Sequence, residues 1–383
     1  MIDPVALTAE LIRRPSVTPD AGAALELLEA ALAPAGFACR RADRGGVPNL
    51  IARWGTGGPV LGFNGHVDVV PSGDEAAWSR PPFSGEIAGG EIWGRGAVDM
   101  KSGVAAFAAA AAGFVADTPP EGSILLLITG DEEGESVDGT RALLDALAAA
   151  GETLDACVVG EPTSVEALGD AVKIGRRGSM TAFVTARGRQ GHTAYPQRAR
   201  NPLPALCRML DRLASEPLDA GSEHFEPSTL QITSIDVANP AHNVIPAEGR
   251  ATLNIRFNDL WDGARVAGRL RAAAAEAGSE EAAEGVALTL ETRISGESFL
   301  TPPGPFVDLA AAAVARATGR RPRLSTGGGT SDARFVKDWC PVVEVGLPGR
   351  GLMHAVDERV PVADVEGLAR VYRELLTGFF GRR

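Results

Sequence analysis

Along the first part of this 383-residue chain, hydrophobic positions alternate between helical spacing and short apolar runs. Residues 3–14 and 21–35 show helical spacing, and Gly36 is a plausible stop for the second helix. Apolar runs bounded by turn residues then predict strands at 49–54, 60–70, 123–129 and 155–160. The Ala-rich stretch at 104–115 is too short to span a membrane and predicts a packed helix. This alternation predicts an α/β domain with a mainly parallel, mixed sheet.

The pattern changes near residue 176. Strands are predicted near 172–187 and at 229–237, 249–257 and 286–293, with helices at 202–214 and 261–277. Beyond residue 300 the helix and strand alternation resumes, at 305–317, 341–346 and 363–379. We therefore expect an α/β domain over 1–175 and 295–383, interrupted by an inserted α+β domain over 176–294.

The composition narrows the function classes. Hydrophobic residues make up 45% and charged residues 22%, as in an ordinary globular protein. The net charge of −12 and the lack of a basic run argue against a nucleic-acid partner, so an anionic substrate must meet local arginines. The four cysteines lie far apart without a CxxC pair, and we interpret them as reduced. The N-terminal segment does not resemble a signal peptide, which predicts a cytoplasmic protein without a membrane role.

Chemistry-bearing residues follow the predicted strands. His66 and Asp68 lie two positions apart in FNGHVDVVP, so on a strand both side chains point to one face and the carboxylate can orient the imidazole. Asp99 follows a Gly-rich turn in IWGRGAVDMKSG and precedes the Ala-rich helix. A lone HxD is incidental in most sequences, so neither motif identifies a site by itself.

Three further segments add acids and a histidine. Asp131, Glu132 and Glu133 follow the most apolar strand directly, in ITGDEEGES. Glu161 follows the next strand in VVGEPT, and His354 lies in GRGLMHAVDERVP before the last helix. Adjacent acids usually form a solvated loop, but carboxylates gathered at the end of a buried strand repel one another unless a cation is present.

Together these residues predict a metal centre, because an open α/β sheet builds its sites where strands end. Imidazole and carboxylate ligands suit zinc, with Co²⁺ or Mn²⁺ as substitutes. Two zinc ions, three ligating carboxylates and one bridging hydroxide sum to a neutral site, which a partly buried cleft tolerates.

The motifs GHVD, GRGAVDMKSG, DEE and GEPT resemble the aminoacylase and carboxypeptidase superfamily of co-catalytic zinc hydrolases over essentially the whole chain. The resemblance implies two Zn²⁺ per subunit. The implied ligands are His66, Asp99, Glu133, Glu161 and His354. In this scheme Asp99 bridges the metals, His66 and Glu161 complete one site, and Glu133 and His354 complete the other.

The resemblance also assigns catalytic roles that the residues alone leave open. It implies Glu132 as the general base and Asp68 as the carboxylate behind His66. It implies a zinc-peptidase-like catalytic domain whose inserted lid forms a homodimer. His192 in GHTAYP is similar to a lid histidine that reaches across the dimer to the substrate carbonyl, although from the residues alone a simple turn histidine is the favoured interpretation.

Within the superfamily, the strings GRRGSM, NVIPAE, NIRF and STGGGTSDARF resemble the desuccinylase branch of lysine and diaminopimelate biosynthesis, whose substrate is N-succinyl-LL-2,6-diaminopimelate. The implied substrate contacts are Arg177, Asn243, Arg256, Gly329 and Thr330. The guanidinium groups of Arg177 and Arg256 would each donate paired hydrogen bonds to a substrate carboxylate. Surface arginines and a flexible Gly-rich turn are the alternative interpretation, and His242 departs from the pattern and receives no role.

Two other functions stay open. The first is that of acetylornithine deacetylases and related aminoacylases or dipeptidases. These enzymes share the metal ligands, so the ligands do not distinguish which acyl group the substrate carries. A non-catalytic, metal-binding dimer is the second, and Glu132 argues against it because that residue would have no binding duty.

Overall fold

The computed structural model describes residues 1–282 and 285–381. The chain folds into two compact units. Unit 1 comprises Met1–Ile174, Thr301–Ser325 and Ser331–Arg383, and unit 2 comprises Gly175–Leu300 and Thr326–Thr330. Unit 2 extends past residue 294, where the sequence placed its end, because a strand of its main sheet continues to Gly296 and residues 299–300 pair with residues 175–176.

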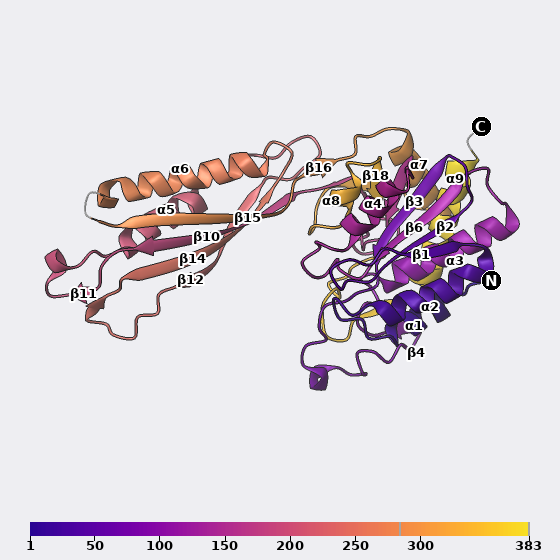
Figure 1. Cartoon of the computed structure of the whole chain (residues 1–383), viewed down its shortest axis with the longest axis horizontal. Helices are drawn as coiled ribbons and strands as arrows, with labels where there is room; N and C mark the ends of the chain where they lie inside the picture. Colours follow the sequence, from indigo (N-terminus) through magenta and orange to yellow (C-terminus); the bar gives the residue numbers. More distant parts are fainter. Residues whose placement is uncertain (283–284, 382–383) are drawn as a thin grey trace. The chain divides into compact units, whose positions relative to one another are not determined.

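Unit 1 is built on an eight-stranded mixed sheet with the order β1-β2-β6-β3-β7-β18-β8-β17 (Figure 1). The strands are β1 Ala38–Arg41, β2 Asn49–Trp54, β3 Val60–His66, β6 Ser123–Thr129, β7 Ala156–Val159, β8 Ala171–Lys173, β17 Arg323–Ser325 and β18 Val342–Glu344. β6, β3, β7 and β18 run parallel to one another. The predicted α/β class with a mainly parallel sheet is confirmed.

Seven helices belong to the described part of unit 1. They are α1 Pro4–Ile12, α2 Gly22–Leu32, α3 Lys101–Asp117, α4 Thr140–Ala149, α7 Pro305–Thr318, α8 Ala333–Val336 and α9 Val362–Phe380. Successive residues of β3 show how two helices use opposite faces of the sheet. Phe63 stacks on Phe107 of α3 at 4.1 Å between ring centroids, whereas the Asn64 side chain donates to Thr140 of α4 at 2.9 Å.

Unit 1 also contains a smaller, three-stranded sheet. It consists of β4 Glu86–Ala88, β5 Glu91–Trp93 and β19 Arg359–Pro361, in the order β19-β5-β4. Two 3-10 turns, η1 Ala33–Ala35 and η2 Glu75–Ala77, complete the unit. β19 joins the segment before α9 to the segment before α3, so two loops distant in sequence are tied together.

The strand predicted at 60–70 is too long. β3 ends at His66, because Val69 leaves the sheet and its main chain pairs with Ser16 and Thr18 instead. An apolar run of eleven residues cannot reveal this change of partner, since the residues stay buried on both sides of it.

Unit 2 contains an antiparallel sheet with the order β12-β14-β10-β15. Its strands are β10 Gly178–Arg187, β12 Thr229–Asp236, β14 Glu248–Phe257 and β15 Ala287–Gly296. Alternate residues along its strands point to one face of the sheet, where they form a hydrophobic core with helices α5 Leu203–Ser215 and α6 Gly263–Ala282. This packing is expected for an α+β unit. The shorter elements are β9 Gly175–Arg176, β11 Gly191–His192, η3 Pro196–Arg198, β13 Val244–Ile245 and β16 Phe299–Leu300.

Within the residues that the structure describes, no helix is long and apolar enough to span a membrane.

Candidate metal centre

Three neighbouring parallel strands end at one edge of the unit 1 sheet. β3 ends at His66, β6 ends at Thr129 just before the DEE triplet, and β7 ends at Val159 just before Glu161. Because the strand order is β6-β3-β7, the side chains that follow these strands converge on the same edge.

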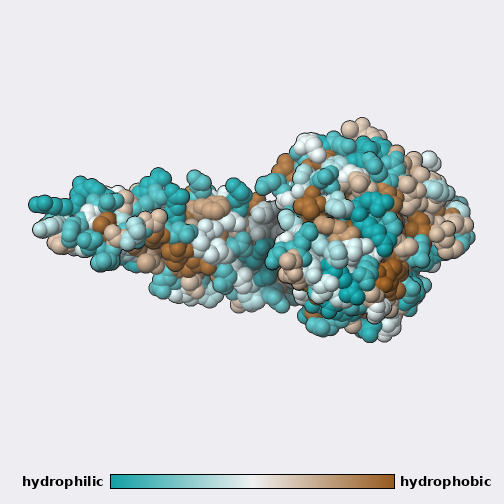
Figure 2. Space-filling view, turned by 90° about the horizontal axis from the view of Figure 1, so that it is seen from below, coloured by the Kyte–Doolittle hydropathy of each residue, from teal (hydrophilic) through white to brown (hydrophobic). Residues whose placement is uncertain are grey.

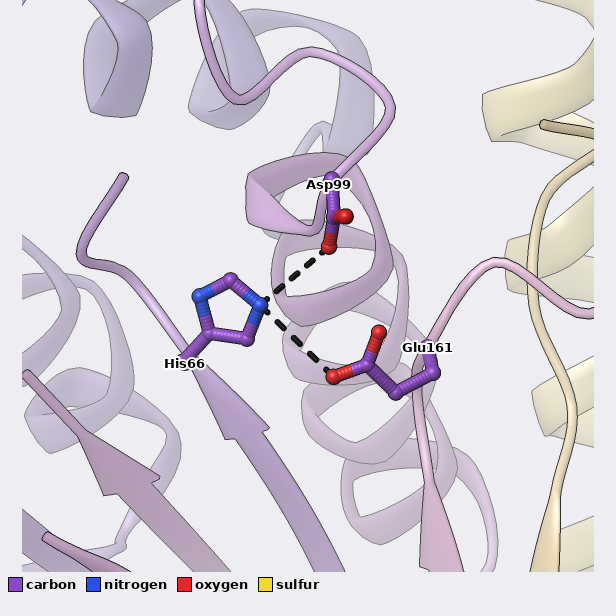
Figure 3. A group of neighbouring side chains, drawn as sticks. All are labelled: His66, Asp99 and Glu161. Atoms are coloured by element: carbon purple, nitrogen blue, oxygen red, sulfur yellow. Dashed lines mark hydrogen bonds and ion pairs between the residues drawn. The ribbon is translucent and has the colours of Figure 1, made fainter. Parts of the chain in front are cut away.

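His66 forms the first group with two carboxylates (Figure 3). Its Nε2 atom lies 3.2 Å from Asp99 Oδ1 and 3.6 Å from Glu161 Oε1. Its Nδ1 atom lies 2.9 Å from the main-chain carbonyl oxygen of Asp68, which can only accept, so Nδ1 carries the proton. In the neutral ring the Nε2 lone pair therefore faces the two carboxylates, an arrangement that needs a cation or an additional proton.

His354 forms a second group on the other side of Asp99. Its Nε2 atom lies 2.9 Å from Glu133 Oε1 and 3.6 Å from Asp99 Oδ2. The two oxygens of Asp99 thus face two different imidazoles, which is the geometry of a carboxylate shared by two cations. His354 itself adopts a left-handed backbone conformation, with a φ of 60°.

The electrostatics of the protein alone show how strongly positive charge is favoured here. Burial lowers the pKa of His66, but Asp99 and the neighbouring carboxylates outweigh it and raise the pKa well above its usual range. Hydrogen bonds with Asp99 and Glu133 raise the pKa of His354 to about 10. Burial raises the pKa of Asp99, yet the two imidazoles hold it below its ordinary value. The donor set therefore fits divalent cations, which would replace these protons.

Asp68 does not orient His66 in the way that the sequence suggested. Its Oδ1 atom lies 3.6 Å from His66 Nδ1, and the main-chain carbonyl of the same residue takes that hydrogen bond. The Asp68 carboxylate instead accepts hydrogen bonds from Thr18 Oγ1 at 2.6 Å and from the main-chain N–H groups of Glu132 and Glu133 at 3.2 and 3.1 Å. Asp68 therefore fixes the turn that carries the two glutamates.

Glu132 and Glu133 point their side chains differently. Glu133 lies on His354, as described above. Burial and the charges of Glu161 and Asp332 raise the pKa of Glu132 well above its ordinary value. A carboxyl group in this setting is prepared to hold a proton, which is what a general base must do after it acts.

The other predicted residues belong to unit 2, whereas the metal-ligand candidates belong to unit 1. His192 is exposed in β11, and its Nδ1 atom accepts a hydrogen bond from Ala194 N at 3.0 Å, so the ring proton is on Nε2. The Asn243 carbonyl accepts from Thr193 N at 3.0 Å, and Asn243 itself is exposed.

Arg177 and Arg256 are half-buried, and they are close enough for electrostatic repulsion. Burial and then the charge of Arg177 lower the pKa of Arg256. Two like charges held together favour a bound anion. Gly329 is contacted by Arg176, whose Nη1 atom donates to its carbonyl at 3.0 Å, and Thr330 lies in the same half-exposed loop.

Sequence reasoning missed two residues that are deeply buried beside the metal centre. Arg95 and Glu358 are 3% and 0% exposed and form an ion pair at 2.9 Å. The only available signal was that both lie inside the motif strings, Arg95 in GRGAVDMKSG and Glu358 in MHAVDERVP.

Comparisons with known proteins agree with this architecture. The model of peptidase family M20/M25/M40 matches residues 62–378. The succinyl-diaminopimelate desuccinylase of Cereibacter sphaeroides (strain ATCC 17025 / ATH 2.4.3) is 62% identical over 381 residues, which cover 99% of each chain. The succinyl-diaminopimelate desuccinylase of Paracoccus denitrificans is 59% identical over 380 residues, covering 99% of this chain and 98% of that one.

Solved structures share the fold at low sequence identity. The M20 family metallo-carboxypeptidase Sso-CP2 from Sulfolobus solfataricus has a TM-score of 0.77 and 17% identity, covering 98% of this chain and 99% of that one. The YXEP protein of Bacillus subtilis, described as a dinuclear metal-binding peptidase of the M20 family, has a TM-score of 0.73 and 15% identity, covering 99% and 98%.

Proposed function

Because the chain belongs to peptidase family M20/M25/M40, we propose that it is a two-metal amide hydrolase that converts N-succinyl-LL-2,6-diaminopimelate to succinate and LL-2,6-diaminopimelate. Membership in the family confirms the superfamily resemblance of the motifs. The observation that carries the proposal is the Asp99 carboxylate, whose two oxygens face His66 and His354. The high identity to desuccinylases supports the choice of the succinyl substrate.

The proposed metal ligands are the five residues of the two groups. His66 and Glu161 hold one cation, Glu133 and His354 hold the other, and Asp99 joins both. Zinc suits this mixture of imidazole and carboxylate donors, with Co²⁺ or Mn²⁺ as substitutes. When bound, the two cations supply Lewis acidity and lower the pKa of water towards about 7.

Glu132 is the proposed general base. It takes the proton from the attacking water and later gives it to the leaving amine. In the metal-free protein, burial and the charges of Glu161 and Asp332 raise its pKa, which favours uptake of a proton at this carboxylate. Asp68 supports the same chemistry by holding the main chain of Glu132 and Glu133 in place.

The residues of unit 2 are proposed to bind the substrate. His192 presents Nε2–H as a donor, which suits a developing oxyanion. Arg177 and Arg256 would bind carboxylates of the succinyl and diaminopimelate parts, and Asn243, Gly329 and Thr330 would add hydrogen bonds. The same reasoning leaves room for acetylornithine and other acylated amino acids, whose metal chemistry would be identical.

We further propose a cytoplasmic homodimer that assembles through unit 2. Figure 2 shows a small group of hydrophobic residues on a side of this unit that is otherwise mostly hydrophilic. Phe183, between the core residues Ala182 and Val184 on β10, points to the sheet face away from the helices and is 38% exposed. A contiguous patch of exposed apolar side chains is typical of a surface that a partner covers.

A direct comparison of substrates tests the proposed function. The zinc-loaded protein should hydrolyse N-succinyl-LL-2,6-diaminopimelate with a higher kcat/KM than N-acetylornithine, as measured by release of the free amine. A preference for the acetyl substrate would overturn the assigned acyl group. Absence of hydrolysis for both, with two zinc ions bound, would favour the non-catalytic alternative.

A further inference from the structure

The side-chain carboxylate of Glu358 lies inside the turn of residues 96–99, which carries the candidate ligand Asp99. It is 0% exposed and its carboxylate accepts three main-chain hydrogen bonds from this turn. Oε2 accepts from Gly96 N at 3.0 Å, and Oε1 accepts from Val98 N at 2.8 Å and from Asp99 N at 3.2 Å. One buried carboxylate thus fixes the backbone of residues 96–99.

Arg95 connects this turn to the segment that carries His354. Its Nη1 atom donates to Glu358 Oε2 at 2.9 Å and to the Ala355 carbonyl at 3.1 Å. Its Nη2 atom donates to the His354 carbonyl at 3.2 Å and, more weakly, to the Pro71 carbonyl at 3.4 Å. One guanidinium group therefore contacts the main chain of a candidate ligand and of the segment that follows His66.

The chemistry of the pair explains why charged groups are suited to this place. Burying two charges is costly, and apolar side chains of similar size often give equal or better stability. Apolar groups cannot accept three N–H groups of one turn, or donate to three carbonyls of other segments. The pair therefore contributes geometry at a point where Asp99 serves both candidate metal groups.

We propose that Arg95 and Glu358 are positioning residues that set Asp99 and His354 at the separation needed for both metals to bind. The inference rests on the proposed metal centre. Their contacts with the segments of Asp99 and His354 are to main-chain groups, so both residues act through the backbone of the ligands. Displacing Asp99 would weaken both metal positions, whereas displacing His354 would weaken only one.

The test uses Glu358→Gln, which keeps the shape of the side chain but replaces one accepting oxygen with an NH₂ group. We expect the variant to bind Zn²⁺ roughly 10–100-fold more weakly than the parent in competition with a chromophoric chelator. The visible absorption spectrum of the Co²⁺-loaded variant should also differ from that of the parent, because the Asp99 ligand shifts. Arg95→Lys keeps the charge but loses the fork, and should weaken Zn²⁺ binding less than Arg95→Met does.

Two controls separate positioning from general loss of stability. Glu152→Gln makes the same chemical change in a carboxylate far from the metal centre. Glu152 accepts hydrogen bonds from Arg53 Nη1 at 2.8 Å and from Arg40 Nη2 at 2.7 Å, and Arg53 lies at the end of β2 that is remote from the metal-centre edge of the sheet. Leu28→Ala removes a fully buried side chain of α2 and lowers the melting temperature. Both controls should keep the parental zinc affinity and Co²⁺ spectrum.

The outcomes separate this inference from the proposed function. If the parent protein binds two Zn²⁺ and Glu358→Gln binds them with equal affinity and an unchanged Co²⁺ spectrum, the positioning role is wrong. If Glu358→Gln does not fold, Arg95→Lys and Arg95→Met decide by the same measurement, and parental affinity in both overturns the role. If the parent binds no Zn²⁺, the proposed function itself is wrong.

Discussion

At the scale of single residues, the metal centre is defined by which atoms face each other. The sequence identified His66, Glu161 and the DEE triplet from their positions after apolar runs, because strand ends of one sheet share an edge. It could not derive their pairing. The contact of Asp99 with both His66 and His354 joins positions far apart in the chain, and only the fold brings them together.

Buried partners were also beyond the reach of the sequence. Glu358 and Arg95 are charged residues in short motifs, where a solvent-exposed position is the more common outcome. Their role depends on main-chain groups that no side-chain pattern encodes. The Asp68 interaction was misplaced for the same reason, since its partners include the N–H groups of a turn.

Replacement of Glu132 by Gln tests the proposed base. We expect Glu132→Gln to keep its zinc content and to lose roughly 10²–10⁴-fold in kcat, because the amide cannot take a proton from water. Zinc content is measured by inductively coupled plasma mass spectrometry and kcat by amine release. Glu135→Gln, an exposed acid in the same loop, is the matched control and should be fully active. Near-parental turnover by Glu132→Gln would rule out this residue as the base.

The pKa of His354 predicts how pH affects the stability of the metal-free protein. Its folded-state pKa of about 10 lies above the ordinary value of 6.5. The protonated imidazole therefore contributes stability that is fully present below about pH 6.5 and is lost as the pH rises towards 10. The free energy of unfolding of the chelated parent should exceed that of chelated His354→Asn at about pH 6, and the difference should shrink at about pH 9.

Urea unfolding of both chelated proteins at the two pH values measures this difference. Using a difference removes contributions that the two proteins share, such as that of buried Lys101, whose pKa burial lowers to about 7. A difference that stays constant or grows with pH would contradict the imidazole–carboxylate contacts of His354.

At the scale of elements, the prediction located the long strands of the sheet and missed most of the short ones. β6 spans Ser123–Thr129, the same residues that the sequence gives as a strand. The three-residue strands β4, β5, β17 and β19 were not predicted, because three residues show neither alternation nor a continuous apolar run. β5 and β19 nevertheless matter for the site, since their pairing joins the segments that precede α3 and α9.

The layer of α3 and α9 against β3 should carry much of the stability of unit 1. Phe107 of α3 is fully buried, stacks on Phe63 of β3 at 4.1 Å and contacts Tyr372 of α9 at 5.4 Å. Phe107→Ala should lower the free energy of unfolding by about 3–5 kcal/mol, through lost burial and the cavity left behind. Chemical denaturation measures the change, and Phe107→Leu, which keeps most of the volume, should lose less. A loss below about 1 kcal/mol for the alanine variant would mean that the surroundings refill this site.

At the scale of the whole molecule, the insertion has a structural basis in the two ends of unit 2. Thr301 N donates to the Ile174 carbonyl at 2.7 Å, and β9 and β16 then pair as the chain enters and leaves the unit. The hydrophobic core of unit 2 is also its own, with buried residues drawn from the sheet and from α5 and α6. This core therefore forms without residues of unit 1.

This arrangement predicts that unit 1 can fold and bind metal without residues 175–300. Thr301 N donates to the Ile174 carbonyl, as the fourth residue of a β-turn donates to the first. An Asn-Gly linker of about two residues should therefore join Ile174 to Thr301 as a β-turn without strain. The shortened protein should unfold cooperatively and bind two Zn²⁺ per chain, because all five candidate ligands are in unit 1. It should hydrolyse the succinyl substrate at least roughly 10²-fold more slowly, since His192 and the paired arginines are removed. Zinc-loaded shortened protein with parental kcat/KM would show that residues 175–300 contribute nothing to the substrate site, and loss of zinc binding in a folded protein would place a ligand among residues 175–300.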